Sequence, residues 1–461
     1  FNYDINGDRS LVVRGGTGVF TGRVPLVFLV NMPTNSAMIQ NTITVTDAKT
    51  LEKFKNNMLT NVDDMIKLLD APTTPIYGDP NSTASRASIA GIADDFKMPQ
   101  IWKNTLAVDY RLPVSFPLTL TVEGMYNKDI YNVVMRNWNI VNNGNLSRFA
   151  GPDNRLDYST STTGNYLVDK NVTGGAVILD NDTRGYSASF NTMVTAEPIK
   201  DLNLMFSYTH QWAKEITGLP GNQAYSTWQG LYAVDGPNNA ELHNAQYLTP
   251  DKLIASLTYR KDYGKYFATS VGLYYAAYSS GMYNYYYSND MNGDKNSFDL
   301  MYIPRTKDEL KFVDKNGFTA AEQAEAFWRF VEQDKYLSAH KGEYAEAYGA
   351  ALPWVHRFDL KVTQDFRLRA GKAIHTLQLS FDILNVGNLL KSSWGVTQTT
   401  SPSNYGKILR YEGKDANGVP TYSMGYNTVN KQKQLYSRTY EPYRNSSNCW
   451  QMQIGLRYIF N

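Results

Sequence analysis

The end of the chain alternates between apolar side chains and polar or small ones. The apolar positions are Trp450, Met452, Ile454, Leu456, Tyr458 and Phe460, and the positions between them are Gln451, Gln453, Gly455 and Arg457. Successive side chains of an extended strand point to opposite faces, so one face meets an apolar environment and the other meets water. A tilted strand needs about 9–11 residues to cross a bilayer, whereas most soluble strands have about 5–6. The segment therefore predicts a strand that crosses a membrane.

Composition decides between the two kinds of membrane-spanning protein. The mean hydropathy is −0.43, and no apolar run approaches the roughly 18 residues of a membrane helix. A β-barrel stays compatible with this value because its polar inner face lowers the average. The net charge of +2 gives no reason to expect a nucleic-acid partner. Aromatic residues make up 13% of the chain, which suits interfacial girdles or sugar-stacking surfaces.

The spacing of the other alternating segments predicts the fold class, an all-β transmembrane antiparallel β-barrel. Short connections (14–23, 112–117, 197–201, 260–265 and 368–372) take turns with long ones (32–100, 131–183, 214–251, 279–352 and 386–447). Outer-membrane barrels have short periplasmic turns and longer extracellular loops. A closed single-chain bacterial barrel has an even number of strands, so a count of about eleven indicates an incomplete barrel. The chain also opens without a methionine or an export signal, and we therefore expect it to be the C-terminal part of a longer protein.

Two of the long connections carry helical patterns. Residues 46–70 place apolar side chains at helical spacing, with Thr46 or Asp47 as the cap. Thr319 and Glu322 form a capping-box pattern before an apolar run. We expect both helices at the outer mouth, where they either pack the loops or form a gate or partner surface.

A repeated Asp-x-Asn-Gly-Asp pattern is the candidate metal-binding motif. Its copies are Asp4, Asn6 and Asp8, and Asp290, Asn292 and Asp294. Oxygen ligands at this spacing around a glycine turn can wrap Ca²⁺. Neither copy has the later Glu of a full EF-hand loop, and Asn-Gly is also a common turn pair. We expect both copies on the extracellular side, and no other cofactor is expected.

Aromatic side chains in two long connections are the candidate ligand-binding residues. They are Tyr225, Trp228, Tyr232, Tyr283, Tyr285 and Tyr287. They could stack on a ligand at the barrel mouth, or form part of the interfacial girdle.

The five histidines are dispersed, and the chain has no HExxH or GxSxG motif, so we do not expect an enzyme. The glycine-rich residues 14–23 lack a phosphate-loop spacing and predict a turn. Cys449 is expected to be a packing residue.

Four further stretches carry a family resemblance. They are Arg14-Gly-Gly-Thr-Gly-Val-Phe-Thr-Gly-Arg23-Val-Pro, Asp299-Leu-Met-Tyr-Ile-Pro304, residues 336–357 (with Lys341-Gly-Glu-Tyr-Ala-Glu346 and Pro353-Trp-Val-His-Arg357), and Phe381-Asp-Ile-Leu-Asn385-Val-Gly-Asn388-Leu-Leu with Trp394-Gly395. Together they resemble the TonB-dependent outer-membrane receptors. The closest branch is the Oar-like one, with an N-terminal carboxypeptidase-regulatory-like domain, and the SusC-like branch is a near relative. The last strand resembles a barrel-assembly signal formed by Trp450, Tyr458 and Phe460, although Asn461 departs from the usual terminal aromatic.

The resemblance implies a plugged barrel of about 22 strands in the outer membrane of a Gram-negative bacterium. Residues 1–461 would be the C-terminal part of that barrel, with the plug and the TonB box before Phe1. The implied function is import of a nutrient (a glycan, a peptide or a chelate). The implied partners are the TonB complex, outer-membrane lipids and, in the SusC-like branch, a surface lipoprotein. The alternatives are a passive porin, a secretion or adhesion barrel, an outer-membrane protease, and a soluble carbohydrate-binding protein.

Overall fold

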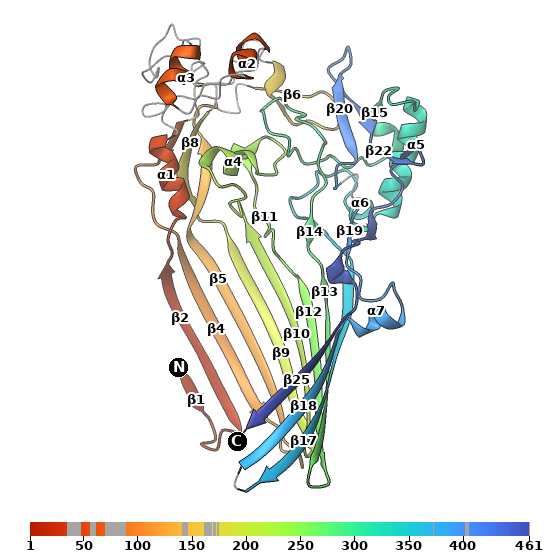
Figure 1. Cartoon of the computed structure of the whole chain (residues 1–461). Coiled ribbons are helices and arrows are strands. Elements are labelled where there is room, and N and C mark those ends of the chain that lie inside the picture. Colours follow the sequence, from red (N-terminus) through yellow and green to blue (C-terminus); the bar gives the residue numbers. More distant parts are fainter. Residues whose placement is uncertain are drawn as a thin grey trace.

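A computed structural model describes the fold of residues 1–34, 48–55, 61–69, 89–140, 146–160, 168, 172, 175–371, 373–401 and 405–460. Its main feature is a tilted, curved wall of long strands with the long connections gathered at one end (Figure 1). The strands that follow one another in this wall are β1 (Asn2–Asp4), β2 (Leu11–Thr21), β4 (Gln100–Arg111), β5 (Leu118–Asn137), β9 (Tyr186–Ile199), β10 (Leu202–Glu215), β12 (Asp251–Tyr263), β13 (Phe267–Ser279), β17 (Trp354–Ala370), β18 (Ala373–Leu384) and β25 (Gln451–Phe460). Each neighbouring pair is antiparallel. The mostly antiparallel β fold is confirmed.

Cross-strand registers show that the wall has one apolar and one polar face. A single row across six strands is entirely apolar: Leu204, Leu257, Leu273, Leu360, Ile383 and Met452. The row beside it, offset by one residue, is polar or small: Asn203, Thr258, Gly272, Lys361, Asp382 and Gln453. This alternation is the one expected for a sheet with lipid on one side and water on the other.

Ion pairs on the polar face link neighbouring strands. Arg14 on β2 contacts Asp109 on β4 and Glu123 on β5, each at 3.0 Å. Lys361 on β17 contacts Asp382 on β18 at 2.6 Å. These side chains are partly exposed, so they are hydrated as well as paired. Among the described residues, no helix is long and apolar enough to cross a membrane.

The first glycine-rich stretch corrects the sequence-based prediction. Residues 14–23 do not form a turn, because β2 continues through them to Thr21 and pairs along its length with β4. Gly15 allows that close pairing: a Cβ there would lie 2.6 Å from the Thr105 carbonyl oxygen. Because the predicted turn is absent, the strand that precedes residue 23 runs in the direction opposite to the one predicted. Asp4, Asn6 and Asp8 therefore lie at the end with the short turns and the C-terminus, and the prediction of an extracellular position for them is wrong (Figure 1).

Smaller elements fill the long-loop end. The helices are α1 (Leu26–Thr34), α2 (Ala48–Lys55), α3 (Val62–Leu69), α4 (Ala224–Gln229), α5 (Ala320–Gln333), α6 (Lys335–Ala339) and α7 (Val386–Leu390). The short strands are β3 (Ile89–Ile92), β6 (Ser147–Arg148), β7 (Leu156–Asp157), β8 (Ala176–Asp182), β11 (His243–Asn244), β14 (Met282–Tyr283), β15 (Lys311–Phe312), β16 (Ala350–Ala351), β19 (Gln398–Thr400), β20 (Leu409–Lys414), β21 (Pro420–Met424), β22 (Tyr426–Val429), β23 (Gln432–Leu435) and β24 (Tyr440–Pro442).

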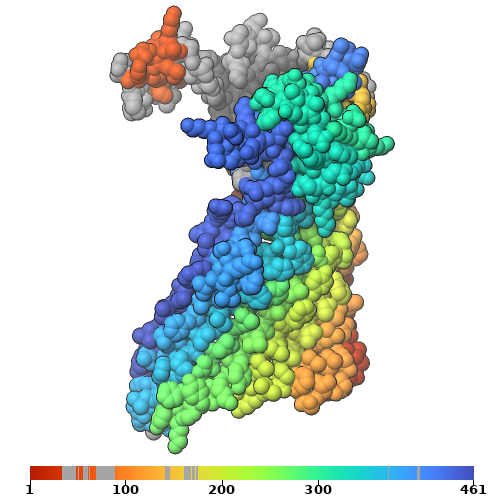
Figure 2. Space-filling view, turned by 90° about the vertical axis from the view of Figure 1, so that its right-hand side faces the viewer, coloured from red at the N-terminus to blue at the C-terminus, as the bar shows by residue number. Residues whose placement is uncertain are grey.

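The helix predictions are confirmed where the structure describes them. α5 has Thr319 as its N-cap, with the reciprocal Glu322 bond of a capping box. The region 46–70 contains α2 and α3, while its expected caps, Thr46 and Asp47, fall outside the described residues. Figure 2 shows the teal segment that contains α5 packed beside the blue segment from the last long loop, above the strands. The described parts of the last long loop and of the loop that contains α5 thus form folded, packed structure.

The closing strand matches its predicted alternation. The side chains of Ile454, Tyr458 and Phe460 are all exposed on the apolar face of β25. Trp450 immediately precedes the strand and is also exposed. The barrel-assembly role of Trp450, Tyr458 and Phe460 stays a prediction. Cys449 is exposed, which corrects its expected place in the packing.

Candidate functional site

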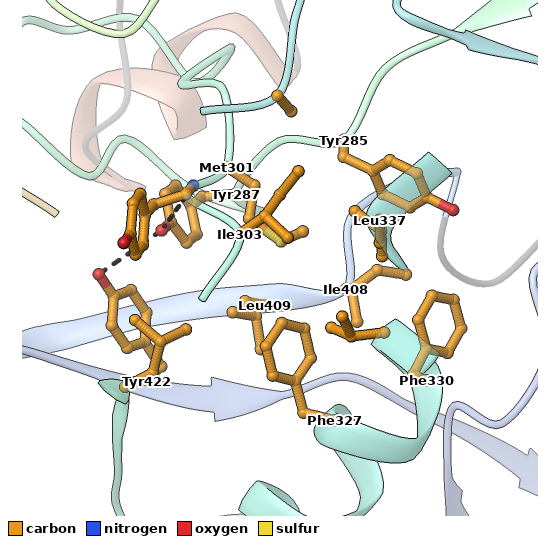
Figure 3. Close-up of a cluster of buried hydrophobic side chains, with 14 of the residues drawn as sticks. Tyr285, Tyr287, Met301, Ile303, Phe327, Phe330, Leu337, Ile408, Leu409 and Tyr422 are labelled. Atoms are coloured by element: carbon orange, nitrogen blue, oxygen red, sulfur yellow. Dashed lines mark hydrogen bonds between the residues drawn. The ribbon is translucent and has the colours of Figure 1, made fainter. Parts of the chain in front are cut away.

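The largest apolar core joins segments from three long loops. It contains Phe149, residues between 283 and 350 with α5, and residues between 408 and 436. Tyr283, Tyr285 and Tyr287 belong to this core, where Figure 3 shows Tyr285 and Tyr287 among labelled apolar side chains. The Tyr287 hydroxyl donates a hydrogen bond to Asp153 at 2.8 Å. The expected stacking surface is therefore a packed core at these three positions.

A second loop core buries another predicted ligand residue. Trp228 on α4 packs with Phe28, Val133 and Leu179, and its indole nitrogen donates a hydrogen bond to Asn238 at 2.8 Å. An indole enclosed on all sides has no face left for a ligand. This position is likewise corrected from a surface to a core residue. Tyr225, which contacts the Trp228 ring at a centroid distance of 5.7 Å, is half-buried beside it.

A buried ion pair ties the three loops together, because the Tyr422 hydroxyl of the last loop also donates a hydrogen bond to Asp153, at 3.2 Å. Arg155 is 0% exposed, and its guanidinium contacts both oxygens of Asp153, at 2.8 and 3.1 Å. It also donates to the Leu300 carbonyl at 2.6 Å, and its centre lies 5.0 Å from the Tyr287 ring centroid. Burial lowers the pKa of Arg155, but the combined electrostatic effects of Asp153, Tyr287 and Asp299 outweigh burial and raise that pKa, so the guanidinium stays charged. We call these residues and the loop core around them the loop block.

Tyr232 lines an open cavity of about 650 Å³ at the long-loop end. The lining consists of Pro220, Gly221, Asn222, Ser226, Gln229, Gly230, Tyr232, Gln246, Phe298 and Tyr348. The Tyr232 ring meets Phe298 and Tyr348 edge-on, at centroid distances of 4.9 and 5.5 Å. Burial raises the pKa of Tyr232, so its hydroxyl stays protonated at neutral pH. The cavity offers ring surfaces together with amide and hydroxyl groups.

Charge is missing from that lining. None of the residues that line the cavity within the described chain carries a formal charge. Side-chain amides from Asn222, Gln229 and Gln246 can each both donate and accept hydrogen bonds. Such a set suits an uncharged solute that bears hydroxyl or amide groups. Gln229, Gln246, Phe298 and Tyr348 were not singled out by the sequence.

The two Asp-x-Asn-Gly-Asp copies fold into the same turn. In each, the first Asp accepts backbone hydrogen bonds three and five residues on: Gly7 and Arg9 donate to Asp4 at 3.0 and 2.8 Å, and Gly293 and Lys295 donate to Asp290 at 2.7 and 2.9 Å. These hydrogen bonds give both copies of the motif the same turn. Among the described residues, no group of three or more His, Cys, Asp or Glu side chains could hold a metal ion. Calcium binding at these positions stays a prediction.

Asp294, in the second copy, should make the stability of its loop depend on pH. Burial and then repulsion from Asp290 raise its pKa from 3.8 to about 7. The unfolded loop therefore loses this proton near pH 4 and the folded loop near pH 7, so stability falls as the pH rises through that window. Hydrogen exchange of residues 289–299, corrected for intrinsic rates, should show more protection at about pH 5 than at about pH 8. Asp294→Asn should weaken this dependence, and an unchanged dependence in that variant would contradict the assignment.

Comparison with known proteins identifies a family match. A family described as "Outer membrane beta barrel domain" matches residues 1–417. No curated protein matches the chain. Among solved structures, the outer membrane transporter YddB from Escherichia coli shares 10% sequence identity with a TM-score of 0.40. The alignment covers 99% of this chain and 40% of that transporter, so the chain spans less than half the length of that protein.

Proposed function

Because the chain belongs to the outer-membrane β-barrel family and lies in the outer membrane, we propose that it forms part of a TonB-dependent transporter that imports a nutrient. In this proposal the wall of long strands belongs to a plugged barrel. The polar face lines the interior, and a TonB complex supplies the energy through segments outside residues 1–461. The four stretches that resemble the Oar-like branch support this finer assignment.

The observation that carries the proposal is the cavity at the long-loop end. A ligand arriving from outside first meets the long loops, and the loop block holds them in one arrangement. Tyr232 and its neighbouring rings provide rigid contact area, while Gln229 and Gln246 provide hydrogen bonds. A recognition site in a fixed structure loses little entropy on binding.

The substrate class follows from the chemistry of the lining. An anionic ferric chelate or an acidic peptide would bind more favourably to a cavity of opposite charge, and the lining side chains carry none. Stacking rings next to amides favour a neutral oligosaccharide over these alternatives. If the SusC-like relationship holds, a surface lipoprotein would complete the site from above. A porin or an adhesion barrel would not need this cavity.

Replacing Tyr232 with alanine should weaken uptake of the substrate. Losing one ring contact worth about 1.4 kcal/mol lowers the apparent affinity about tenfold. The measurement is uptake of labelled neutral oligosaccharides, neutral peptides and iron chelates by cells that lack the gene and carry the whole protein or a variant on a plasmid. Outer-membrane levels are matched by immunoblot.

Tyr443→Ala is the matched control, because Tyr443 is an exposed tyrosine that does not line the cavity. We expect Tyr443→Ala to transport normally and Tyr232→Ala to need a higher concentration of the same solute. Equal uptake by both variants would show that the cavity does not recognise the substrate.

A further inference from the structure

The chain leaves the barrel wall sideways after β18. Residues 385–395, called the α7 ledge below, fold against the outside of β17, and Figure 1 shows α7 projecting from the wall at the level of the upper strand ends. A Cβ added to Gly387 would lie 4.0 Å from the Phe358 ring. Phe358 pairs with Tyr275 in the apolar face of the wall. The ledge therefore lies on the face that meets lipid, beside the transport path and outside it.

Asn385 fixes the start of the ledge. It is completely buried and adopts a left-handed conformation with φ of 53°. Its side-chain amide donates to the carbonyls of Gly395 and Asn448 at 3.0 and 3.2 Å, and its backbone N–H donates to Asp359 at 2.7 Å. Gly395 has φ of 64°, and a Cβ there would collide with the Asn385 amide. The close contact between the two residues explains why position 385 is Asn and position 395 is Gly.

Asn388 fixes the far side of the ledge. Its amide nitrogen donates to the carbonyls of Ser392 and Trp394 at 2.9 and 3.1 Å. Its amide oxygen accepts a hydrogen bond from the Trp450 backbone N–H at 3.2 Å. The ledge is thus bonded both to itself and to the chain entering β25. Its conformation is set by polar groups that point inward.

The outward side chains of this rigid ledge are apolar. Leu390 is 75% exposed, and Leu389 and Trp394 are also exposed. Exposing two leucines and a tryptophan together to water on a fixed backbone is unfavourable, and an apolar environment around them would stabilise the ledge. Trp354, which begins β17, and Trp450, which precedes β25, are exposed at the same end of the wall.

Charge complements this apolar surface. Lys391 follows the two leucines, and its ammonium lies 5.9 Å from the Trp394 ring centroid. Tryptophan prefers the boundary between acyl chains and head groups, and lysine near that boundary extends its ammonium toward lipid phosphates. The sequence of apolar, aromatic and basic groups matches that of a helix lying in a membrane interface.

We propose that the α7 ledge inserts into the membrane leaflet on the long-loop side, with Leu389, Leu390 and Trp394 among the upper acyl chains and Lys391 at the lipid phosphates. The bilayer is the occupant because the ledge is continuous with the lipid-facing side of β17 and carries a cation at head-group level. The Asn385 and Asn388 bonds keep the ledge on that face. This inference rests on the outer-membrane location and not on the transport proposal.

Fluorescence quenching tests the insertion. The whole protein carries Cys449→Ser, which removes the single cysteine of residues 1–461, and any cysteine outside this range is also replaced by serine. Leu390→Cys is then labelled with an environment-sensitive nitrobenzoxadiazole. The labelled protein is placed in nanodiscs of phosphatidylcholine and phosphatidylglycerol, with or without bromine near the carbonyl end of the acyl chains. We expect brominated lipid to reduce the emission by half or more, and aqueous iodide to quench it several-fold less than a label at Tyr247→Cys, a loop position that is 87% exposed.

A second labelling position controls for the possibility that Leu390→Cys itself disturbs the ledge. Ser393→Cys alters one exposed side chain by a single atom, and its label should respond to the same shallow bromines. If labels at residues 390 and 393 are both as open to iodide as the one at 247 and do not respond to brominated lipid, the ledge is not in the membrane and the proposal is wrong. A label at Ile454→Cys, near the middle of β25 on the apolar face, serves as the control that shows whether the strands themselves are in the bilayer.

Discussion

Replacing Arg155 with alanine should destabilise the loop block by about 3–5 kcal/mol, because it leaves the Asp153 carboxylate buried without its cation. It also removes the bond to Leu300 and the contact with the Tyr287 ring. These contacts join loops that are far apart in the sequence, so the loss should spread beyond residue 155. Hydrogen exchange of residues 283–303 and 409–424, measured on the whole protein in nanodiscs, should show the lower protection.

The chain provides a matched control for this change. Arg148 pairs with Asp235 at 3.0 Å, but the two side chains are 46% and 24% exposed. Arg148→Ala should therefore cost no more than about 1 kcal/mol. In a third variant, Arg155→Met with Asp153→Asn, stability should partly return because neither member of the pair is left as an unpaired buried charge. The return is only partial because Asp299, 3.6 Å from Arg155, loses its cation. A similar small effect for Arg155→Ala and Arg148→Ala would show that the buried pair does not hold the loops.

Ile454→Arg should cost about 2–4 kcal/mol of folding free energy in a bilayer, since it places a charge on the lipid-facing side of β25 near the middle of the strand. Ile454 is 63% exposed in the isolated chain and lies across from Phe381 in the apolar face. An arginine at this exposed position destabilises the protein only if a bilayer surrounds it. Urea titration of folding into liposomes measures the change for the whole protein.

Gln453→Arg is the control for the lipid-facing change. Gln453 is the adjacent residue, also exposed, and lies across from Asp382 on the polar face. An arginine there stays in water beside a carboxylate, so folding should change little. Equal effects at positions 453 and 454 would contradict the assignment of the two faces.

The fold was largely predictable because its main signal is local. A period of two in residues such as 454, 456 and 458 directly reports which side of a strand meets lipid. The prediction failed where one residue type occurs in two different structural settings. Gly15 and Gly16 suggested a turn, yet both lie inside β2, and the missing side chain of Gly15 lets the backbone of β4 approach. That distinction depends on a neighbour about 90 residues away in the sequence.

The candidate site was less predictable because its residues come together only in the folded loops. Tyr283, Tyr285 and Tyr287 have the composition of a stacking surface, but α5 and the last long loop cover them. Conversely, Gln246 and Tyr348 reach the cavity from segments about 100 residues apart. Loops have no periodic pattern that separates a buried tyrosine from an exposed one. Tyr232 was the predicted residue that proved to line the cavity.

Energy dependence of uptake tests the central claim most directly. Cells that lack the gene, with and without the whole protein at matched outer-membrane levels, take up the labelled solute in the presence or absence of a protonophore. A TonB-dependent transporter should lose its contribution when the proton-motive force collapses, and uptake should fall to that of cells without the protein. Uptake that persists unchanged with the protonophore would contradict energised import and indicate a passive pore.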